Sequence, residues 1–187
     1  MYFASQNKNK IREISALLPA GFEVKGIDDV TSSELEETGA TLEENALQKA
    51  SFVAAATGEA AFADDTGLEV EALNGAPGVI SARYAGEQKN AADNIAKILR
   101  EMEGVENRKA QFRTVIALVK EGETHLFEGK VEGTIAAAPC GEQGFGYDPI
   151  FIPNGSSRTF AEMSLEEKNQ WSHRARALKK LVGFLQA

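Results

Sequence analysis

The chain has a single cysteine, Cys140, among its 187 residues. One cysteine cannot form an intramolecular disulfide or a cysteine-based zinc site. We therefore expect Cys140 to be a small buried residue. The sequence also lacks any apolar run of about 18 residues, and its N-terminal stretch lacks the apolar segment of a signal peptide. These absences predict a cytoplasmic protein that does not contact membranes.

Positive charge is scarce as well. The chain has 20 Lys and Arg residues against 28 Asp and Glu residues, which gives a net charge of −8. This acidic balance argues against a nucleic-acid-binding protein. A polyanionic substrate would have to be held by local basic residues or by a metal ion. With 43% hydrophobic residues the chain can build one sizeable core, so we predict a single domain over residues 1–187.

Apolar spacing predicts both strands and helices. We expect helices over 11–18, 41–58, 90–102 and 164–185, and strands over 2–4, 22–27, 110–120 and 124–138. The last two strands should form a long hairpin. The polar stretch 28–39 predicts a loop long enough to be functional, and the apolar-rich loop 75–84 predicts a buried or interface segment.

Two adjacent carboxylates, Asp64 and Asp65, stand between apolar runs at 60–63 and 68–73. This pattern predicts a strand, an acidic turn and a second strand. Because like charges repel, a divalent cation would stabilise the pair, and oxygen ligands suit Mg²⁺ or Mn²⁺. The alternative is an Asx-type turn in which Asp64 and Thr66 bond local backbone while Asp65 faces water.

Polar and basic residues also fill the gap between the first expected strand and helix. Donors at a helix N-terminus could hold a phosphate group; they are Ser5, Gln6, Asn7, Lys8, Asn9 and Lys10. The stretch is not a Walker loop, because the glycine and the Gly-Lys-Ser/Thr ending are missing. The alternative is a Ser or Asn helix cap with two solvated lysines.

Two further stretches could serve a ligand. The segment Gly144 to Tyr147 mixes glycines with aromatic residues and could lie against a flat molecule, or form a plain turn with aromatic residues in the core. Positive charge and donors gather at Lys168, His173, Arg174 and Arg176, and a solvated helix face is the usual explanation of such a cluster.

Seven short motifs, in order along the chain, resemble those of the inosine triphosphate pyrophosphatase family. They are Ser5-x-Asn7-x-x-Lys10, Glu36-Glu37-Thr38-Gly39, Glu44-Asn45-Ala46, Ala63-Asp64-Asp65-Thr66-Gly67, Ser81-Ala82-Arg83-Tyr84, Gly144-Phe145-Gly146-Tyr147-Asp148-Pro149 and Ser172-His173-Arg174. Many members carry Thr-Gly where this chain has Ser5-Gln6, which affects how closely the loop approaches phosphate.

The resemblance implies an α/β fold with an elongated mixed central sheet flanked by helices, two lobes with a cleft between them, and a homodimer. It implies hydrolysis of non-standard purine nucleoside triphosphates such as ITP, dITP and XTP to monophosphate and pyrophosphate. The implied cofactor is Mg²⁺, with Mn²⁺ as an alternative. No nucleic acid or membrane partner is implied.

The resemblance also assigns roles to residues. Asp65 resembles the proton acceptor and a metal ligand, and Glu37 resembles the second metal ligand. The positions that resemble substrate-binding ones are Ser5, Gln6, Asn7, Lys8, Asn9, Lys10, Thr66, Phe145, Gly146, Tyr147, Asp148, Lys168, His173 and Arg174. Supporting roles fall to Glu44, Lys49, Asp64 and Arg83. His173 and Arg174 would donate to the 6-oxygen of the base, which would exclude adenine.

Three alternatives stay open at this point. One is a Maf-type pyrophosphatase that acts on other modified nucleotides, and a second is a regulator that binds nucleotides without hydrolysis. The presence of both Glu37 and Asp65 speaks against the regulator, because a binder has little need of a base for a metal-bound water. The third alternative is a structural α/β domain with an acidic surface.

Overall fold

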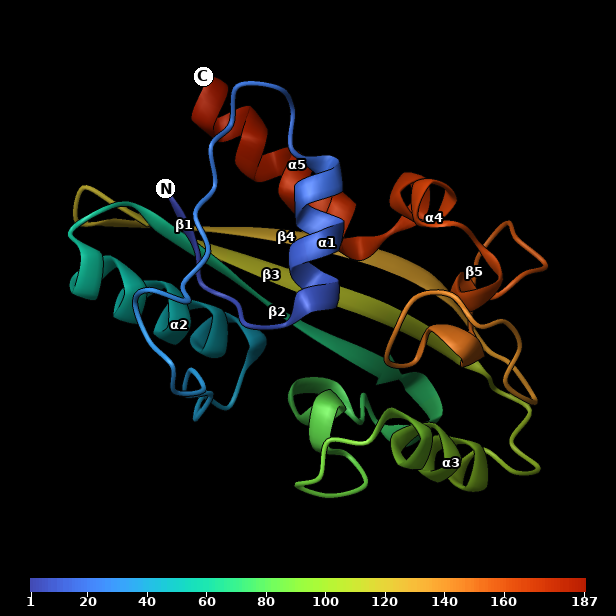
Figure 1. Ribbon diagram of the computed structural model, residues 1–187. Helices are drawn as coiled ribbons and strands as arrows, with labels where there is room; N and C mark the ends of the chain where they lie inside the picture. The colour runs from blue at the N-terminus through green and yellow to red at the C-terminus, as the bar shows by residue number, and fades with distance from the viewer. The chain divides into compact units, whose positions relative to one another are not determined.

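A sheet of five strands in the order β1-β2-β3-β4-β5 runs through the computed structural model, which describes residues 1–187 (Figure 1). The strands are β1 (Tyr2–Phe3), β2 (Ala61–Val70), β3 (Lys109–Lys120), β4 (Glu123–Ile135) and β5 (Phe151–Pro153). Strand β1 pairs with β2 in parallel, and β5 pairs with β4 in the antiparallel direction. The sheet is therefore mixed, which confirms the predicted α/β class; the predicted cleft stays a prediction.

Five α-helices accompany the sheet. They are α1 (Lys8–Leu17), α2 (Leu42–Thr57), α3 (Ala91–Glu101), α4 (Leu165–Trp171) and α5 (His173–Gln186). Side chains of Asn7, Thr41, Asn90 and Ser164 cap the first four by accepting hydrogen bonds from backbone N–H groups of the first turn. None of these helices combines the length and the apolar character needed to cross a bilayer.

Short 3₁₀ helices lie in the connections. They are η1 (Glu71–Leu73), η2 (Gly78–Arg83), η3 (Asp148–Ile150) and η4 (Phe160–Glu162). The predicted hairpin is confirmed: Glu121 and Gly122 join β3 to β4 and have φ angles of 54° and 81°. Two consecutive positive φ values match the tight turn that the right-handed twist of paired strands favours.

Several expected elements differ from the structure. Residues 60–73 hold no acidic turn, because β2 continues through Asp64 and Asp65. The alternative of an Asx turn with Asp65 facing water is also wrong, since that residue is 6% exposed. The expected strand over 22–27 is reduced to one bridge between Tyr2 and Lys25. An alternation of apolar and polar residues over so short a segment does not guarantee that the segment finds a strand to pair with.

Two more expectations are wrong. The closing helix over 164–185 is two helices, because the backbone of Ser172 is extended, with φ −69° and ψ 151°. Cys140 is exposed, whereas a buried residue was expected. It lies in a loop where its backbone, not its thiol, is held: its N–H donates to Pro149 O and its carbonyl accepts from Thr159.

The residues group into two compact units. Unit 1 comprises Met1–Asp65, Thr114–Gly129 and Arg174–Ala187, and unit 2 comprises Thr66–Arg113 and Lys130–His173. The prediction of one domain over 1–187 stays a prediction.

Each unit has its own apolar core. The core of unit 1 contains a stack of Phe3 on Phe62, with ring centroids 4.8 Å apart, packed with residues of α1 and α5 such as Ile14 and Leu178. The core of unit 2 contains the rings of Phe112, Phe151 and Phe160 together with Ile98 and Met102 of the α3 region. Burial of this apolar surface is the main stabilising contribution in each unit.

Candidate active site

Seven charged side chains meet in unit 1, and we call them the charge cluster. Strand β2 contributes two of them, helices α1, α2 and α5 contribute four, and the loop before α2 contributes one: Lys10, Glu13, Glu37, Lys49, Asp64, Asp65 and Arg174. Four are carboxylates and three are cations, so the cluster has a surplus of negative charge. Buried charges persist only where they are paired.

Strand alternation gives the two aspartates different partners. Neighbouring side chains on a strand point to opposite faces, and Figure 1 shows α1 and α5 on one side of the unit 1 part of the sheet and α2 on the other. Asp64 contacts Lys10 and Arg174, from α1 and α5, whereas Asp65 contacts Lys49, from α2.

Each oxygen of the Asp64 carboxylate lies beside a cation. Its Oδ1 lies 3.3 Å from Lys10 Nζ, and its Oδ2 accepts from Arg174 Nε at 3.0 Å. Burial alone would raise the pKa of Asp64, but Lys10 and Arg174 outweigh it and hold the pKa well below the usual range. Asp64 is therefore an anion that organises two cations.

Glu13 completes this side of the cluster, and the sequence analysis missed it. It is 3% exposed, and its Oε2 accepts from Arg174 Nη1. A signal was present, because Glu13 follows Lys10 by three residues and so shares its helix face. The guanidinium of Arg174 thus has two carboxylate partners, and the expected contact of Arg174 with a base stays a prediction.

Lys49 links the second aspartate to the loop before α2. Its Nζ donates to Glu37 Oε1 at 2.6 Å and to the backbone oxygen of Asp64 at 2.7 Å, and lies 3.8 Å from Asp65 Oδ1. Burial by itself would lower the pKa of Lys49, but Asp65 and Glu37 outweigh it and raise the pKa. The ammonium therefore keeps its charge although it is only 6% exposed.

The loop that carries Glu37 is fixed by side chains of α2. Thr38 N donates to Gln48 Oε1 at 2.9 Å, and Gly39 N donates to Asn45 Oδ1 at 2.7 Å. A Cβ at Gly39 would come within 2.5 Å of Glu44 Cβ, so the loop can approach the helix this closely only with glycine. Helix and loop together place Glu37 beside Lys49.

Two buried carboxylate oxygens of the cluster accept no hydrogen bond, Asp64 Oδ1 and Asp65 Oδ2. Asp64 Oδ1 has Lys10 Nζ 3.3 Å away, whereas the cation beside Asp65 lies at its other oxygen. Burial raises the pKa of Asp65 above its ordinary value despite the opposing effect of Lys49 and Lys10. A buried acceptor without a donor is costly, and a cation at Asp65 Oδ2 would remove the cost.

The pair Glu37 and Asp65 fits Mg²⁺ or Mn²⁺. Mg²⁺ is commonly held by one or two carboxylates, with water and substrate phosphates as its other ligands. No group of three or more His, Cys, Asp or Glu residues that could hold a metal is present, so a cage made of protein ligands alone is not supported. The donor set suits a metal that arrives with a phosphate ligand.

Most of the expected phosphate loop lies at the surface. Asn7 Oδ1 caps α1 by accepting from Asn9 N and Lys10 N, and Ser5 Oγ accepts from Asn7 N at 3.2 Å. Gln6 donates to Ser33 O, and the side chains of Lys8 and Asn9 are exposed. The expected cap is confirmed, but Lys10 is not a solvated lysine, because it pairs with Asp64.

A second cluster lies in unit 2, and we call it the aromatic cluster: Phe112, Phe145, Asp148, Phe160, Lys168 and His173. Lys168 Nζ donates to Asp148 Oδ2 at 2.7 Å and lies over the rings of Phe145 and Phe160, 4.8 and 5.6 Å from their centroids. The ring of His173 stacks on Phe112 at 4.6 Å. Cations over aromatic faces are stabilised by the ring quadrupole.

Asp148 also shapes the segment that carries Phe145. Its Oδ2 accepts from Phe145 N at 3.0 Å. A Cβ at Gly144 would lie 2.2 Å from the same oxygen, and Gly144 has φ +70°, so a side chain is excluded there. The turn therefore leaves the half-buried ring of Phe145 beside the Lys168 ammonium.

The other expected residues are distributed as follows. Tyr147 is 6% exposed and donates its hydroxyl to Ser81 O at 2.6 Å, while Thr66 is half-buried in β2. Gly146 is half-buried and Arg83 ends η2 with partial exposure. Glu44 is exposed and accepts from Ala40 N at 2.6 Å.

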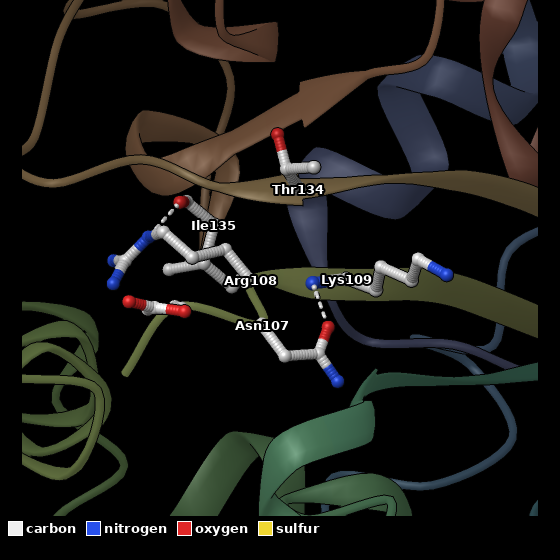
Figure 2. Close-up of a pocket in the computed structure, with 6 residues that line it drawn as sticks. Asn107, Arg108, Lys109, Thr134 and Ile135 are labelled. Carbon is white, nitrogen blue, oxygen red and sulfur yellow. Dashed lines mark hydrogen bonds between the residues drawn. The ribbon is translucent and has the colours of Figure 1, made fainter. Parts of the chain in front are cut away.

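A depression of about 610 Å³ lies elsewhere in unit 2 (Figure 2). It is lined by Glu106, Asn107, Arg108, Lys109, Thr134 and Ile135. The guanidinium of Arg108 donates to the backbone oxygens of Ile135, Ala136 and Met102. Arg108 therefore acts as a backbone clamp, and the depression contains none of the expected site residues.

Fold and site together define a mixed α/β protein with a buried carboxylate–lysine centre in unit 1 and a lysine–aromatic cluster in unit 2. A model of the Ham1 family matches residues 1–184. The chain belongs to the Ham1 family, and the expected family relationship is confirmed.

Known members of the family are similar over their full length. The dITP/XTP pyrophosphatase of Flavobacterium johnsoniae is 50% identical over 188 residues, which covers 100% of this chain and 98% of that protein. The dITP/XTP pyrophosphatase of Porphyromonas gingivalis is 53% identical, covering 99% of this chain and 96% of that protein. The structure of the Staphylococcus aureus Ham1 protein matches with a TM-score of 0.90 and 44% identity, covering 99% of this chain and 97% of that one.

Proposed function

We propose that this protein is a nucleoside triphosphate pyrophosphatase that hydrolyses ITP, dITP and XTP to monophosphate and pyrophosphate. The observation that carries the proposal is the buried Asp65, whose Oδ2 accepts no hydrogen bond while Lys49 lies beside its other oxygen. The full-length similarity to dITP/XTP pyrophosphatases supports the choice of substrate class.

Glu37 and Asp65 would hold the Mg²⁺ ion. A bound Mg²⁺ lowers the pKa of a water ligand and neutralises phosphate oxygens. Asp65 would orient the attacking water and accept its proton. Lys10 and Lys49 would stabilise the charge that develops on the leaving pyrophosphate.

The aromatic cluster of unit 2 would recognise the purine base. The ring of Phe145 offers a stacking surface, and Lys168 and His173 carry N–H donors suited to the 6-oxygen of hypoxanthine and xanthine. Adenine has an amino group at that position, so a donor would face a donor and leave buried polar groups unpaired, at about 1–3 kcal/mol each. We therefore expect ATP to be a poor substrate.

One assay separates the proposal from its alternatives: pyrophosphate release from ITP, dTTP and ATP, each with Mg²⁺ and with a chelator. We expect rapid release from ITP alone and only with Mg²⁺. Preference for dTTP would indicate a Maf-type enzyme. Tight binding of ITP without release would indicate a regulator.

We also propose that the protein is a cytoplasmic homodimer. The loop 75–84 includes Ile80, a large apolar side chain that is 37% exposed. Two-fold dimers use the same patch of both subunits, so this loop would pack on its own copy or on a neighbouring surface. Sedimentation of a monomer alone at micromolar concentration would contradict the proposed dimer.

A further inference from the structure

We propose that the Lys49 ammonium is an exchangeable counter-ion, which holds Glu37 and Asp65 together when no metal is bound and leaves both carboxylates when a divalent cation takes its place. This inference rests on the proposed function, because it takes these two residues as the metal pair. It adds a role for Lys49 that precedes substrate binding.

The geometry places Lys49 where a metal would compete with it. Its Nζ lies 2.6 Å from Glu37 Oε1 and 3.8 Å from Asp65 Oδ1, so one ammonium contacts both carboxylates. A cation bound to the same two residues would stand within a few ångströms of that ammonium. Two positive charges at such a distance repel strongly in a partly desolvated site.

The ammonium also satisfies the carboxylate pair incompletely. Asp65 Oδ2 still accepts no hydrogen bond, and the contact at 3.8 Å is longer than a hydrogen bond. A divalent ion supplies twice the charge and can ligate that remaining oxygen. The exchange therefore replaces a weaker electrostatic partner of the pair with a stronger one.

A third contact allows Lys49 to leave the carboxylates without losing every partner. Its Nζ donates to the backbone oxygen of Asp64 at 2.7 Å, and this oxygen belongs to neither proposed metal ligand. The ammonium can keep that hydrogen bond as a pivot while it releases Glu37. The Glu37 side chain is 38% exposed, so a hydrated ion can reach this side of the pair.

Two other lysines that pair with buried aspartates are arranged differently. Lys10 pairs with Asp64, which also binds Arg174, and a metal there would have to displace two cations. Lys168 has Asp148 as its ion-pair partner, at 2.7 Å. Of these three lysines, Lys49 is the one that contacts two carboxylates from different segments. The oxygen of Asp65 without a hydrogen bond, Oδ2, is not the oxygen nearest to Lys49.

The test measures Mn²⁺ binding to nucleotide-free protein by electron paramagnetic resonance, which counts free Mn²⁺. We expect Lys49→Met to bind Mn²⁺ about tenfold more tightly than the wild type, because the competing charge is gone. Lys49→Arg keeps the charge and should bind like the wild type. Lys168→Met removes a buried lysine of unit 2, and Lys25→Met removes a surface lysine; neither should change the affinity.

Two further variants control for misfolding and for Mn²⁺ binding elsewhere on the protein. Lys49→Gln serves if Lys49→Met does not fold by circular dichroism, since the amide removes the charge but keeps a donor. Adding Asp65→Asn to either variant should abolish the gain, which assigns the bound ion to this pair.

The outcomes distinguish the inference from the proposed function. If the wild type binds Mn²⁺ and the charge-removing variants bind it equally or more weakly, Lys49 does not compete with the metal and the inference is wrong. If no variant binds Mn²⁺, even with a non-hydrolysable ITP analogue, the proposed metal pair itself is wrong.

Discussion

Each unit buries a lysine beside an aspartate, but only one of the two pairs is complete. In unit 2, Lys168 Nζ lies 2.7 Å from Asp148 Oδ2, and that oxygen also accepts from Phe145 N. In unit 1, Lys49 lies 3.8 Å from Asp65 Oδ1, and Oδ2 accepts no hydrogen bond.

The difference has a consequence for function. A buried pair with good geometry and additional hydrogen bonds fixes the shape of its surroundings. A buried carboxylate with an unsatisfied oxygen keeps the capacity to bind a ligand, and such exceptions call for an explanation. This difference supports the proposed division of roles, with chemistry at the unit 1 charge cluster and recognition of the base at the unit 2 aromatic cluster.

The largest effect should follow from Asp65→Asn. The amide keeps the shape but loses the charge that would bind metal and accept a proton. Loss of a general base typically costs about 10²–10⁴-fold in rate, and loss of metal binding should move kcat to the upper end or beyond. Pyrophosphate release from ITP measures this, with Glu59→Gln at the surface of the same unit as a control.

Asp65→Asn should not unfold the protein, because the variant removes a buried charge that burial disfavours. An unchanged kcat in a folded variant would refute the division of roles between the two clusters.

Stability should respond most to Asp64→Asn. The variant leaves Lys10 and Arg174 facing an uncharged amide in a site where Asp64 is 1% exposed. Removing one partner of a buried ion pair costs about 3–5 kcal/mol. Asp148→Asn should cost less, since Asp148 has one cationic partner. Urea unfolding of both variants makes the comparison, and an equal or larger loss for Asp148→Asn would contradict it.

The stabilisation by Asp64 should also depend on pH. The folded-state pKa of Asp64 is lowered, so the unfolded state takes up a proton first as the pH falls. The contribution is therefore complete above the unfolded pKa of about 4 and decreases below it, towards the lowered folded pKa. Urea unfolding of wild type and Asp64→Asn should show a difference that is constant from pH 7 to about 5 and shrinks at pH 3. A difference that grows on acidification would have the wrong sign.

Lys168→Met should affect binding more than turnover. The aromatic cluster would lose the donor that we assign to the base, and a hydrogen bond to a charged group contributes about 1.5–3 kcal/mol. We expect KM for ITP to rise about 10- to 100-fold while kcat changes less. Steady-state kinetics on ITP decide this. A loss confined to kcat would show that Lys168 acts in the chemical step and does not bind the base.

Local patterns predicted much of the fold from the sequence. The caps at Asn7, Thr41 and Ser164 have the side-chain chemistry that begins a helix, and the structure confirms each. The strand expected over 22–27 did not form, because strand formation depends on a pairing partner that is distant in sequence. The prediction that Cys140 is buried was wrong for a similar reason, since burial is decided by tertiary packing.

The candidate site was predictable as a set of residues but not as a set of contacts. Asp65, Lys49 and Glu37 were all singled out, yet their spacing gives no hint that one ammonium contacts both carboxylates. Glu13 and Arg174 meet although 161 residues separate them. Such pairs depend on how helices pack on the sheet, which no local pattern contains.

The smallest effect should come from Tyr147→Phe, a variant in a residue that sequence resemblance places against the substrate. Its hydroxyl donates to Ser81 O at 2.6 Å, and its ring belongs to the core of unit 2. The hydroxyl therefore stabilises the fold. Its loss leaves one buried carbonyl without this donor, which lowers the free energy of unfolding by about 1 kcal/mol. We expect kcat and KM for ITP to stay within about twofold of the wild type, because the Tyr147 hydroxyl is already used by its hydrogen bond to Ser81 O. Thermal unfolding and ITP kinetics on the same preparation test both halves. Unchanged stability with a raised KM would show that the Tyr147 hydroxyl serves the ligand, and the aromatic cluster would then extend to Tyr147.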